Sequence, residues 1–356
     1  MLRLDGGGEG GHLTELASGV DALYLSGRAQ LPGWFVASLG EARERAGSGS
    51  RPQVVVLGTE AFTVGAAGMG RYRYRLDHEH GPIGVTESEA FPAFRIQPRS
   101  EFLHAVGPAA AVDWYRSVLG SVADPVVLTV SRIDLHSDWQ GWSVDGDDRR
   151  RFLCRANRRD TYERAEEFSG FVFGQRKTKT VLCRIYDKTR EVEQKGHDWW
   201  TDKWGDRFDA DERVLRVEFE FGREGLKSLQ VNRPEEALEA VGDLWRYASE
   251  DWLTYRDPSD DRTPSRWPVA AEWQDIQAAS LRSEAVGLVR IREGSKRGSL
   301  RKLLPGLNGY LVGFAAHVET TTVEDTLAAA VPYLKQYELT SGQAFADRVE
   351  ERKGAA

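Results

Sequence analysis

The sequence is poor in cysteine and methionine and has no long apolar segment. It contains two methionines and two cysteines, and the cysteines are Cys154 and Cys183. Two thiols are too few for a cysteine-based zinc site, and they are typical of a protein kept in a reducing compartment, so we expect a cytoplasmic location. No stretch approaches the roughly 20 apolar residues that cross a membrane, and the Gly-rich N-terminal residues have no signal-peptide core, so we expect no membrane partner.

An excess of basic residues is also absent. The chain has 48 Lys and Arg against 55 Asp and Glu, a net charge of −7. This argues against a general binder of polyanions, because nonspecific nucleic-acid binding depends on neutralised phosphates. Basic residues nevertheless cluster at residues 149–164 and 290–302, and such clusters can form local basic faces on an acidic protein. Solvated surface runs are the simpler interpretation of either cluster.

The length of 356 residues predicts two domains, or one domain with large additions. Residues 1–18 are Gly-rich and expected to be flexible. Residues 19–255 mix long strand patterns with helical ones, including a predicted helix at 147–155, which favours an α+β domain with a largely antiparallel sheet. Pro, Asp and Ser gather at residues 256–268 and predict a linker, and residues 269–356 are predicted to form a helical C-terminal region.

Three predicted strands separate polar from apolar residues. Successive side chains of a strand point to opposite faces, so each of these strands has one core face and one polar face. A sheet with an ordinary hydrated face would also alternate in this way. The repeated combination of arginine with titratable groups favours a functional face. The polar sets are Arg132, Asp134, His136 and Asp138; Arg184, Tyr186 and Lys188; and Arg216, Glu218 and Glu220.

These residue types suit metal-assisted chemistry on a phosphate. Carboxylates such as Asp134 and Glu218 are the ligands that hard divalent cations prefer, and His136 would add an imidazole for Mn²⁺. Arg184 fits phosphate through its forked guanidinium group. Tyr186 would then be a nucleophile, with its ordinary pKa of about 10 lowered by neighbouring cations and a bound metal ion. A tyrosine that only packs in a strand is the commoner alternative.

A resemblance to the replication initiation factor family rests on three segments. They are SRIDLHSD (131–138), GFVFGQRKTKTVLCRIYDKTRE (170–191) and LRVEFEF (215–221). That family includes rolling-circle initiators of staphylococcal plasmids and relaxases of some integrative conjugative elements. The resemblance covers roughly residues 90–225. Its combination of Arg-Ile-Tyr-x-Lys with Arg-Val-Glu-x-Glu is moderately specific, and each half alone is weak.

The resemblance implies a DNA-nicking and strand-transfer enzyme. Tyr186 would attack the scissile phosphate, form a 5′-phosphotyrosyl intermediate and free a 3′-OH, with Arg184 and Lys188 as its basic catalytic neighbours. The implied fold is a divergent relative of the nickases that bind metal through a His-hydrophobic-His motif. This chain lacks the motif, since no two of its seven histidines are separated by a single apolar residue.

The resemblance also implies a Mg²⁺ or Mn²⁺ site. Asp134 and Glu218 would hold the ion, with Glu220, His136 and Gln97 as further candidates. The plasmid initiators carry Glu at the position of Gln97, and an amide offers a ligand oxygen without the charge. This departure weakens that position as a metal ligand.

The implied partner is DNA at an origin or transfer site, single-stranded or in a hairpin at the nick. The helical C-terminal region would read origin duplex DNA, or contact a host helicase or a second copy of the chain in a homodimer. Exposed bases would stack on Trp139, Trp142, Trp199, Trp200 or Trp204, unless these are packing residues. The candidate DNA-binding residues are Arg132, Arg149, Arg150, Arg151, Arg155, Arg158, Arg159, Arg176, Lys177, Lys179 and Arg216.

Two other functions remain open from the sequence. A noncatalytic DNA-binding regulator could keep the same fold, and Gln97 is the feature that favours it. A metal nuclease that activates water would not need Tyr186 as a nucleophile. A covalent protein–DNA adduct would distinguish the nickase from the noncatalytic regulator. Cleavage that survives loss of the Tyr186 hydroxyl would indicate the water-activating nuclease.

Overall fold

The computed structural model describes residues 13–49, 52–164, 167–282, 300–341, 344–347 and 349. The chain divides into two compact units, residues 1–288 and residues 289–356. Residues 290–299 of the second basic cluster lie outside the described residues.

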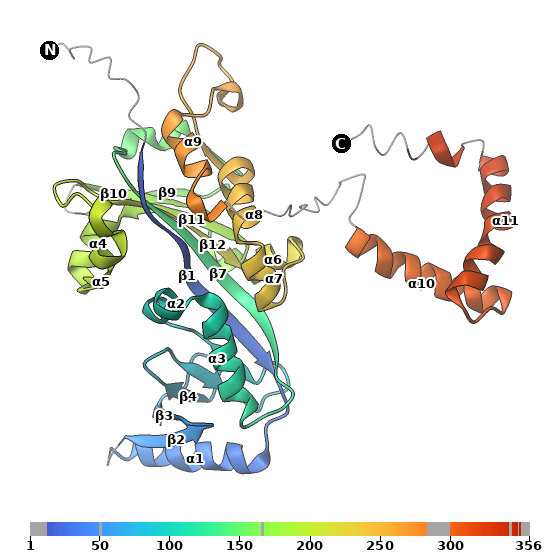
Figure 1. The fold of residues 1–356 in the computed structure, drawn as a ribbon, viewed down its shortest axis with the longest axis horizontal. Helices are drawn as coiled ribbons and strands as arrows, with labels where there is room; N and C mark the ends of the chain where they lie inside the picture. Colours follow the sequence, from blue (N-terminus) through green and yellow to red (C-terminus); the bar gives the residue numbers. More distant parts are fainter. Residues whose placement is uncertain are drawn as a thin grey trace. The chain divides into compact units, whose positions relative to one another are not determined.

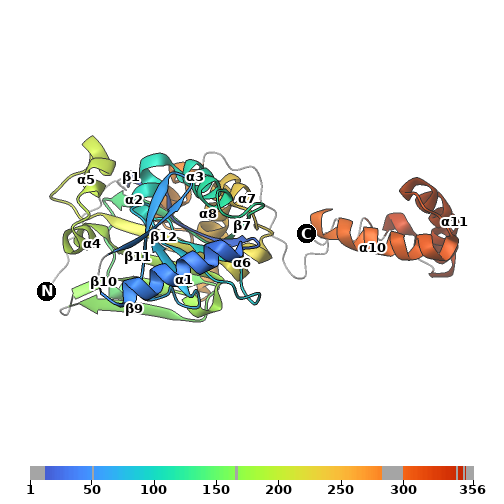
Figure 2. The ribbon, with the colours of Figure 1, turned by 90° about the horizontal axis from the view of Figure 1, so that it is seen from below.

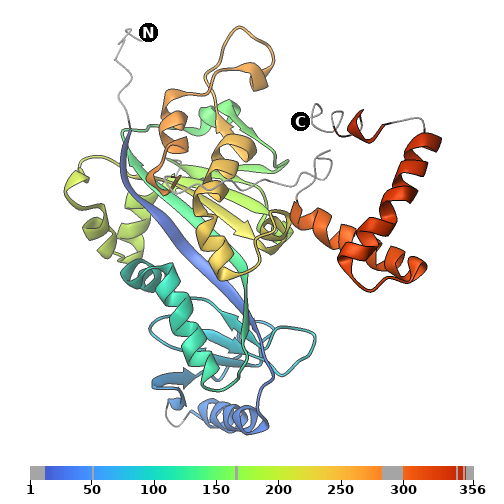
Figure 3. The ribbon, with the colours of Figure 1, turned by 45° about the vertical axis from the view of Figure 1, so that its right-hand side comes forward.

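The described strands of the first unit form one eleven-stranded antiparallel sheet and one separate two-stranded sheet (Figure 1). The large sheet contains β1 (Thr14–Arg28), β2 (Gln53–Leu57), β3 (Glu60–Val64), β4 (Tyr74–Asp77), β5 (Ile83–Val85), β6 (Phe94–Ile96), β7 (Val127–Gln140), β9 (Arg159–Arg164), β10 (Glu167–Phe173), β11 (Val181–Asp187) and β12 (Leu215–Gly222). Its order is β2-β3-β4-β5-β6-β1-β7-β12-β11-β10-β9, so the long strands β1 and β7 join the short strands to the β9–β12 group (Figure 3). The second sheet pairs β8 (Phe152–Cys154) with β13 (Leu253–Tyr255). The predicted α+β class with a mainly antiparallel sheet is confirmed.

Short helices surround the large sheet. Helix α1 packs against β2, β3 and β4. In the view from below, α1 lies nearest to the viewer (Figure 2). The helices of this unit are α1 (Gly33–Gly47), α2 (Ser100–Val106), α3 (Pro108–Gly120), α4 (Lys188–Lys195), α5 (Trp199–Trp204), α6 (Arg223–Ser228), α7 (Pro234–Glu239), α8 (Val241–Arg246) and α9 (Ala271–Gln277), with a π-helical turn at Tyr247–Trp252. The 3₁₀ turns are Gly146–Arg151, Arg176–Thr178, Gly205–Arg207, Pro264–Arg266 and Ser280–Arg282.

The core lies on one face of the central strands. Leu135, Val217 and Phe219 are fully buried there, as their alternation with polar residues predicts. Helices α8 and α9 cover this face through Trp245 and Trp273, and the rings of Phe219 and Trp245 meet edge to face at 5.2 Å. The opposite face therefore carries the polar residues of the same strands.

Both predicted ends of the α+β domain differ from the structure. Strand β1 begins at Thr14, inside the range expected to be flexible. Residues 256–268 are followed by Trp273 and Ile276, which lie in the core of the first unit. The division of the chain falls between residues 288 and 289 instead. A Pro-rich loop within a domain can have the same composition as a linker between domains. Composition alone therefore does not tell whether the chain after the loop packs on the same core.

The predicted helix at 147–155 is wrong. Asp145 and Asp148 form a capping box that starts a 3₁₀ turn at Gly146–Arg151, and the chain then enters β8. Within β8, Phe152 is fully buried against β13. The burial of this aromatic side chain outweighs the helical tendency of the arginines around it.

The second unit consists, among its described residues, of helices α10 (Leu300–Val318) and α11 (Val323–Ser341). The rings of Phe314 and Tyr333 join the two helices at 5.4 Å. A helical C-terminal region is therefore present, although it begins later than residue 269. Among the described helices, none is both long and apolar enough to cross a membrane.

Replacement of Trp273 tests whether residues beyond the Pro-rich loop belong to the first unit. Its side chain is fully buried and its Nε1 donates to the Ser249 carbonyl at 2.8 Å. Trp273→Ala should lower the free energy of unfolding by about 3–5 kcal/mol in urea denaturation. Trp34→Ala is the control, since Trp34 is 64% exposed and its loss should change stability by less than about 0.5 kcal/mol. Equal effects of the two substitutions would contradict the assignment.

Candidate active site

Backbone pairing brings the polar residues of three strands together. Across β11, β12 and β7, one row contains Arg184, Glu218 and His136. The next row contains Tyr186, Arg216 and Asp138. Directly paired residues point to the same face of an antiparallel sheet. A cleft of about 500 Å³ lies over this face, and its lining includes Asp21, Asp134, Tyr186 and Glu218.

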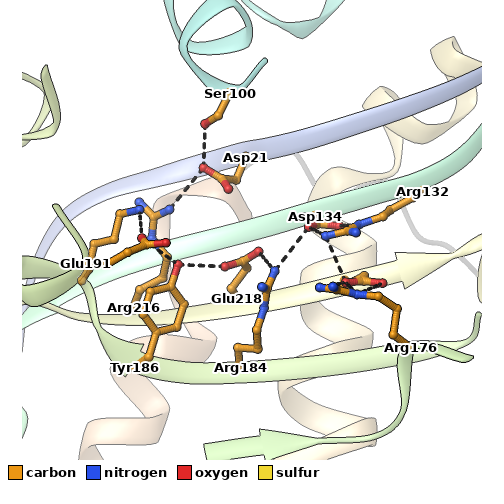
Figure 4. Close-up of polar contacts among 12 residues, drawn as sticks. Asp21, Ser100, Arg132, Asp134, Arg176, Arg184, Tyr186, Glu191, Arg216 and Glu218 are labelled. Atoms are coloured by element: carbon orange, nitrogen blue, oxygen red, sulfur yellow. Dashed lines mark hydrogen bonds and ion pairs between the residues drawn. The ribbon is translucent and has the colours of Figure 1, made fainter. Parts of the chain in front are cut away.

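The Tyr186 hydroxyl lies on the polar face and not in the apolar core. It donates a hydrogen bond to Glu218 Oε2 at 3.0 Å, and Glu191 Oε2 lies 3.4 Å from the same oxygen (Figure 4). The ring is partly exposed to the cleft. The phenol oxygen is therefore held beside two carboxylates, and Tyr186 forms part of the cleft lining.

The neighbouring cations alone do not lower the pKa of Tyr186. Burial raises the pKa of Tyr186 well above its usual range, and the negative charge of Glu218 adds to this. Arg216 opposes the shift but does not outweigh it. The phenol is therefore held protonated, with Glu218 as the hydrogen-bonded acceptor of its proton.

Arg184 connects this tyrosine to the second acidic group. Its guanidinium pairs with Glu218 Oε1, and its Nη2 lies 3.6 Å from Asp134 Oδ2. Its Nε is buried and has no hydrogen-bond partner among the described residues. A buried donor without a partner costs roughly 1–3 kcal/mol, so Arg184 has an unused N–H beside the cleft.

The predicted metal ligands Asp134 and Glu220 form ion pairs with arginines. Arg132 Nε donates to Asp134 Oδ1 at 2.7 Å, and Arg132 Nη2 lies 3.0 Å from Glu220 Oε2. Arg176 Nη2 lies 2.9 Å from the same Glu220 oxygen. Burial raises the pKa of Asp134 to about 8, with the charges of Glu218 and Glu220 adding to the shift and Arg132 opposing it. These carboxylates therefore form an arginine-paired network in this structure.

Arg216 is buried and does not form a DNA-binding surface, contrary to the prediction. Its side chain has no exposed area, and it holds Asp138 by two hydrogen bonds of 2.6 and 2.8 Å. It also donates to Asp21 Oδ1 at 3.2 Å and lies over the Trp200 ring at 4.0 Å. Trp204 Nε1 completes the site by donating to Asp138 Oδ2 at 2.8 Å.

A group that could hold a metal ion lies next to this pair. Asp21, His104 and His136 offer ligand atoms that all lie within 4.8 Å of one another. Neither ring nitrogen of His136 has a hydrogen-bond partner among the described residues, and neither does Nε2 of His104. Burial lowers the pKa of His136 to about 3, and Arg216 adds to this, so its imidazole is neutral and has a free lone pair.

This donor set fits a transition-metal ion better than the predicted set does. Two imidazoles with one carboxylate suit Mn²⁺ or Zn²⁺, whereas Mg²⁺ prefers oxygen ligands alone. Of the predicted ligands, His136 alone belongs to this group, while Gln97 lines the cleft. The sequence gives little signal for Asp21 and His104. Asp21 sits at a register shift in β1, and His104 comes from α2, outside the three polar strands.

Lys188, predicted as a catalytic neighbour, is 4% exposed. Its ammonium pairs with Glu191 and lies 4.8 Å from the Trp200 ring centre. Burial raises the pKa of Glu191, but Lys188 and Lys195 outweigh it and hold that pKa at about 2. Lys188 therefore keeps Glu191 charged near the tyrosine and has little free surface for DNA.

Most of the tryptophans proposed to stack on bases are packing residues. Trp199 is partly exposed and lines the cleft. The other four, each at most 6% exposed, are Trp139, Trp142, Trp200 and Trp204.

The arginines at residues 149–159 differ in their contacts and exposure. Arg151 stacks on Tyr255 at 4.0 Å and pairs with Asp257, and Arg159 donates to backbone carbonyls. These two are structural, which differs from their predicted role. The other candidates are at least partly exposed, some of them with an acidic partner: Arg149, Arg150, Arg155, Arg158, Arg176, Lys177 and Lys179.

Comparison with solved structures gives a distant likeness in fold. No family model and no curated protein sequence matches the chain. Among solved structures, a rolling circle replication initiator protein from Geobacillus stearothermophilus is similar at 14% identity and a TM-score of 0.49, over 78% of this chain and 99% of that one. A likeness at this level does not identify a reaction or the residues that perform it.

Removal of one charge from the Arg216–Asp138 pair should be strongly destabilising. Asp138→Asn removes the carboxylate that holds the buried Arg216 guanidinium by two hydrogen bonds and leaves only the longer contact with Asp21, so we expect a loss of about 3–5 kcal/mol in urea denaturation. Glu41→Gln breaks an exposed ion pair with Arg45 and should cost less than about 1 kcal/mol. A small and equal loss in both variants would contradict the structural role of the buried pair.

Proposed function

We propose that this chain is a DNA-nicking and strand-transfer protein of the rolling-circle initiator or relaxase type. The observation that carries the proposal is the Tyr186 hydroxyl, which faces a cleft and donates to Glu218 at 3.0 Å. A nucleophile hydrogen-bonded to a base, with the base oriented by a third group, is the arrangement of covalent catalysis. Arg184 is that third group, since it holds the other oxygen of Glu218.

The reaction follows from these positions. Tyr186 Oη attacks the scissile phosphorus and gives its proton to Glu218 as the new O–P bond forms. The bond from phosphorus to the 3′ oxygen breaks, which leaves the 5′ phosphate on the tyrosine, and the departing 3′ oxygen takes a proton from solvent water to become a 3′-OH. The unused Nε–H of Arg184 supports a further role for this residue, donation to a phosphate oxygen.

Asp21, His104 and His136 would hold the metal ion that such a reaction uses. A divalent ion there would neutralise charge on the scissile phosphate. Asp21 lines the same cleft as Tyr186, and Ser100 Oγ donates to its carboxylate at 2.9 Å. Ser100 and Arg216 thereby orient Asp21 toward the two histidines.

The proposed substrate is DNA that is single-stranded or folded into a hairpin at the nick. Trp199 is partly exposed and lines the cleft, and an aromatic ring in that position is suited to stack on an unpaired base. Arginine pairing of Asp134 and Glu220 supports the second candidate, a regulator that binds DNA without cutting it.

Loss of the Tyr186 hydroxyl should abolish the covalent intermediate. Wild-type protein, Mn²⁺ and supercoiled plasmid carrying the DNA beside the gene should give a protein–DNA adduct on a denaturing gel. Tyr186→Phe should give none while still binding the DNA. Tyr24→Phe is the matched control, because Tyr24 lines the same cleft under Arg132 and should keep the adduct.

The same experiment distinguishes the nickase from a water-using nuclease and from a noncatalytic regulator. Cleavage that persists in Tyr186→Phe would show a nuclease that uses water. Binding by wild type without any adduct would support the noncatalytic regulator. Either result would contradict the proposed reaction.

The metal site can be tested without catalysis. Mn²⁺ at about 100 times its dissociation constant should stabilise wild type by about 2.7 kcal/mol, seen as a rise in Tm. His104→Ala should lose this rise, and His317→Ala should keep it, because His317 is exposed on α10. Mg²⁺ should stabilise wild type less. An unchanged Mn²⁺ response in His104→Ala would contradict the assignment.

A further inference from the structure

A second groove, of about 420 Å³, lies beside the Tyr186 cleft. It follows β10 between β9 and β11, and it ends at the 3₁₀ turn that carries Arg176 and Lys177. Arg184 lines both this groove and the Tyr186 cleft. The two hollows are therefore neighbours that share Arg184 in their walls. The volume of the second groove lies within the roughly 300–1,000 Å³ usual for ligand clefts.

Strand register places a second tyrosine in line with Tyr186. Gly170 of β10 pairs with Tyr186 on one side and with Tyr162 of β9 on the other. Gly170 has φ +153°, and an added Cβ would lie 2.4 Å from the Ile185 carbonyl oxygen, so a side chain does not fit there. The row therefore has a tyrosine on each outer strand and no side chain between them.

Along the rest of β10, the groove is lined by residues with a small side chain or none. Val172 and Gly174 line it, and an added Cβ on Gly174 would meet the Val181 carbonyl oxygen at 2.7 Å. Tyr162 stands at the side of this floor and is 50% exposed. No other described aromatic ring packs against it. An exposed aromatic ring above a floor of small residues is a platform for a flat ligand.

The charges of the groove are nearly balanced. Arg158 Nε donates to Asp160 at 2.7 Å, and Arg176 and Arg184 are paired with Glu220 and Glu218. Lys177 is the cation of the lining without an acidic partner among the described residues. Paired guanidinium groups attract phosphate weakly. The groove therefore favours an uncharged flat group over a phosphate.

We propose that this groove binds a nucleobase of the single-stranded DNA that flanks the nick, stacked on Tyr162. This inference rests on the proposed function, since it takes the strand that reaches Tyr186 as its ligand. Asp160 and Gln175 lie in the same lining and offer hydrogen-bonding groups to the edge of the base. Tyr162 is a binding residue for the strand and has no part in the bond changes at phosphorus.

A pair of matched strands tests the stacking contact. Fluorescence anisotropy would compare a short oligothymidylate with an abasic strand of the same length, which keeps the phosphates and lacks the bases. Wild type should prefer the oligothymidylate. Tyr162→Ala should reduce that preference by roughly 5- to 100-fold, since an aromatic ring contributes stacking to one base. Tyr162→Phe should keep it, because the ring remains.

Two further variants separate stacking from charge and from folding. Lys177→Ala should lower the salt dependence of binding by about one phosphate contact and leave the base preference unchanged. Tyr333→Ala, an exposed tyrosine of the second unit, should change neither property. Urea denaturation should give Tyr162→Ala the stability of wild type.

The outcomes distinguish this inference from the proposed reaction. An unchanged base preference in Tyr162→Ala overturns the groove assignment, even if Tyr186 forms an adduct with DNA. A lost preference without any adduct supports the groove and contradicts the nicking reaction. Absence of single-strand binding by wild type overturns both.

Discussion

Burial of charge on one face of the sheet is the constraint on which the rest of this structure depends. Moving an ion out of water costs several kcal/mol, so a buried carboxylate needs a cation beside it. Strands β7 and β12 place acidic residues side by side, and arginines from β7, β11, β12 and a neighbouring turn pair with them. The buried or partly buried pairs are Arg216 with Asp138, Arg132 with Asp134, Arg184 with Glu218 and Arg176 with Glu220.

This pairing determines which groups remain available for chemistry. The arginines pair with the carboxylates. The described buried groups near this network that have no hydrogen-bond partner include Nε2 of His104, both ring nitrogens of His136 and Nε of Arg184. The Tyr186 hydroxyl has a carboxylate to accept its proton and a cleft in front of it. Covalent catalysis needs an acceptor for the proton of the nucleophile, and Glu218 is placed to accept the proton of Tyr186.

The sequence predicted the faces of the strands better than the contacts made on them. Alternation in β7, β11 and β12 placed Tyr186 and Glu218 on one face because the side-chain period of a strand is fixed. It did not predict that Arg216 would be fully buried, since burial depends on Trp200 and Trp204 from a separate helix. Asp21 sits at a register shift in β1, a feature that alternation does not encode.

Peptide mapping of the protein after reaction with DNA tests the central claim most directly. Proteolysis and mass spectrometry of the denatured, nuclease-treated product identify the residue that carries a nucleotide. A 5′-phosphonucleotide on Tyr186 is the predicted result. The same modification on another residue, or nicked DNA with an unmodified protein, would contradict it.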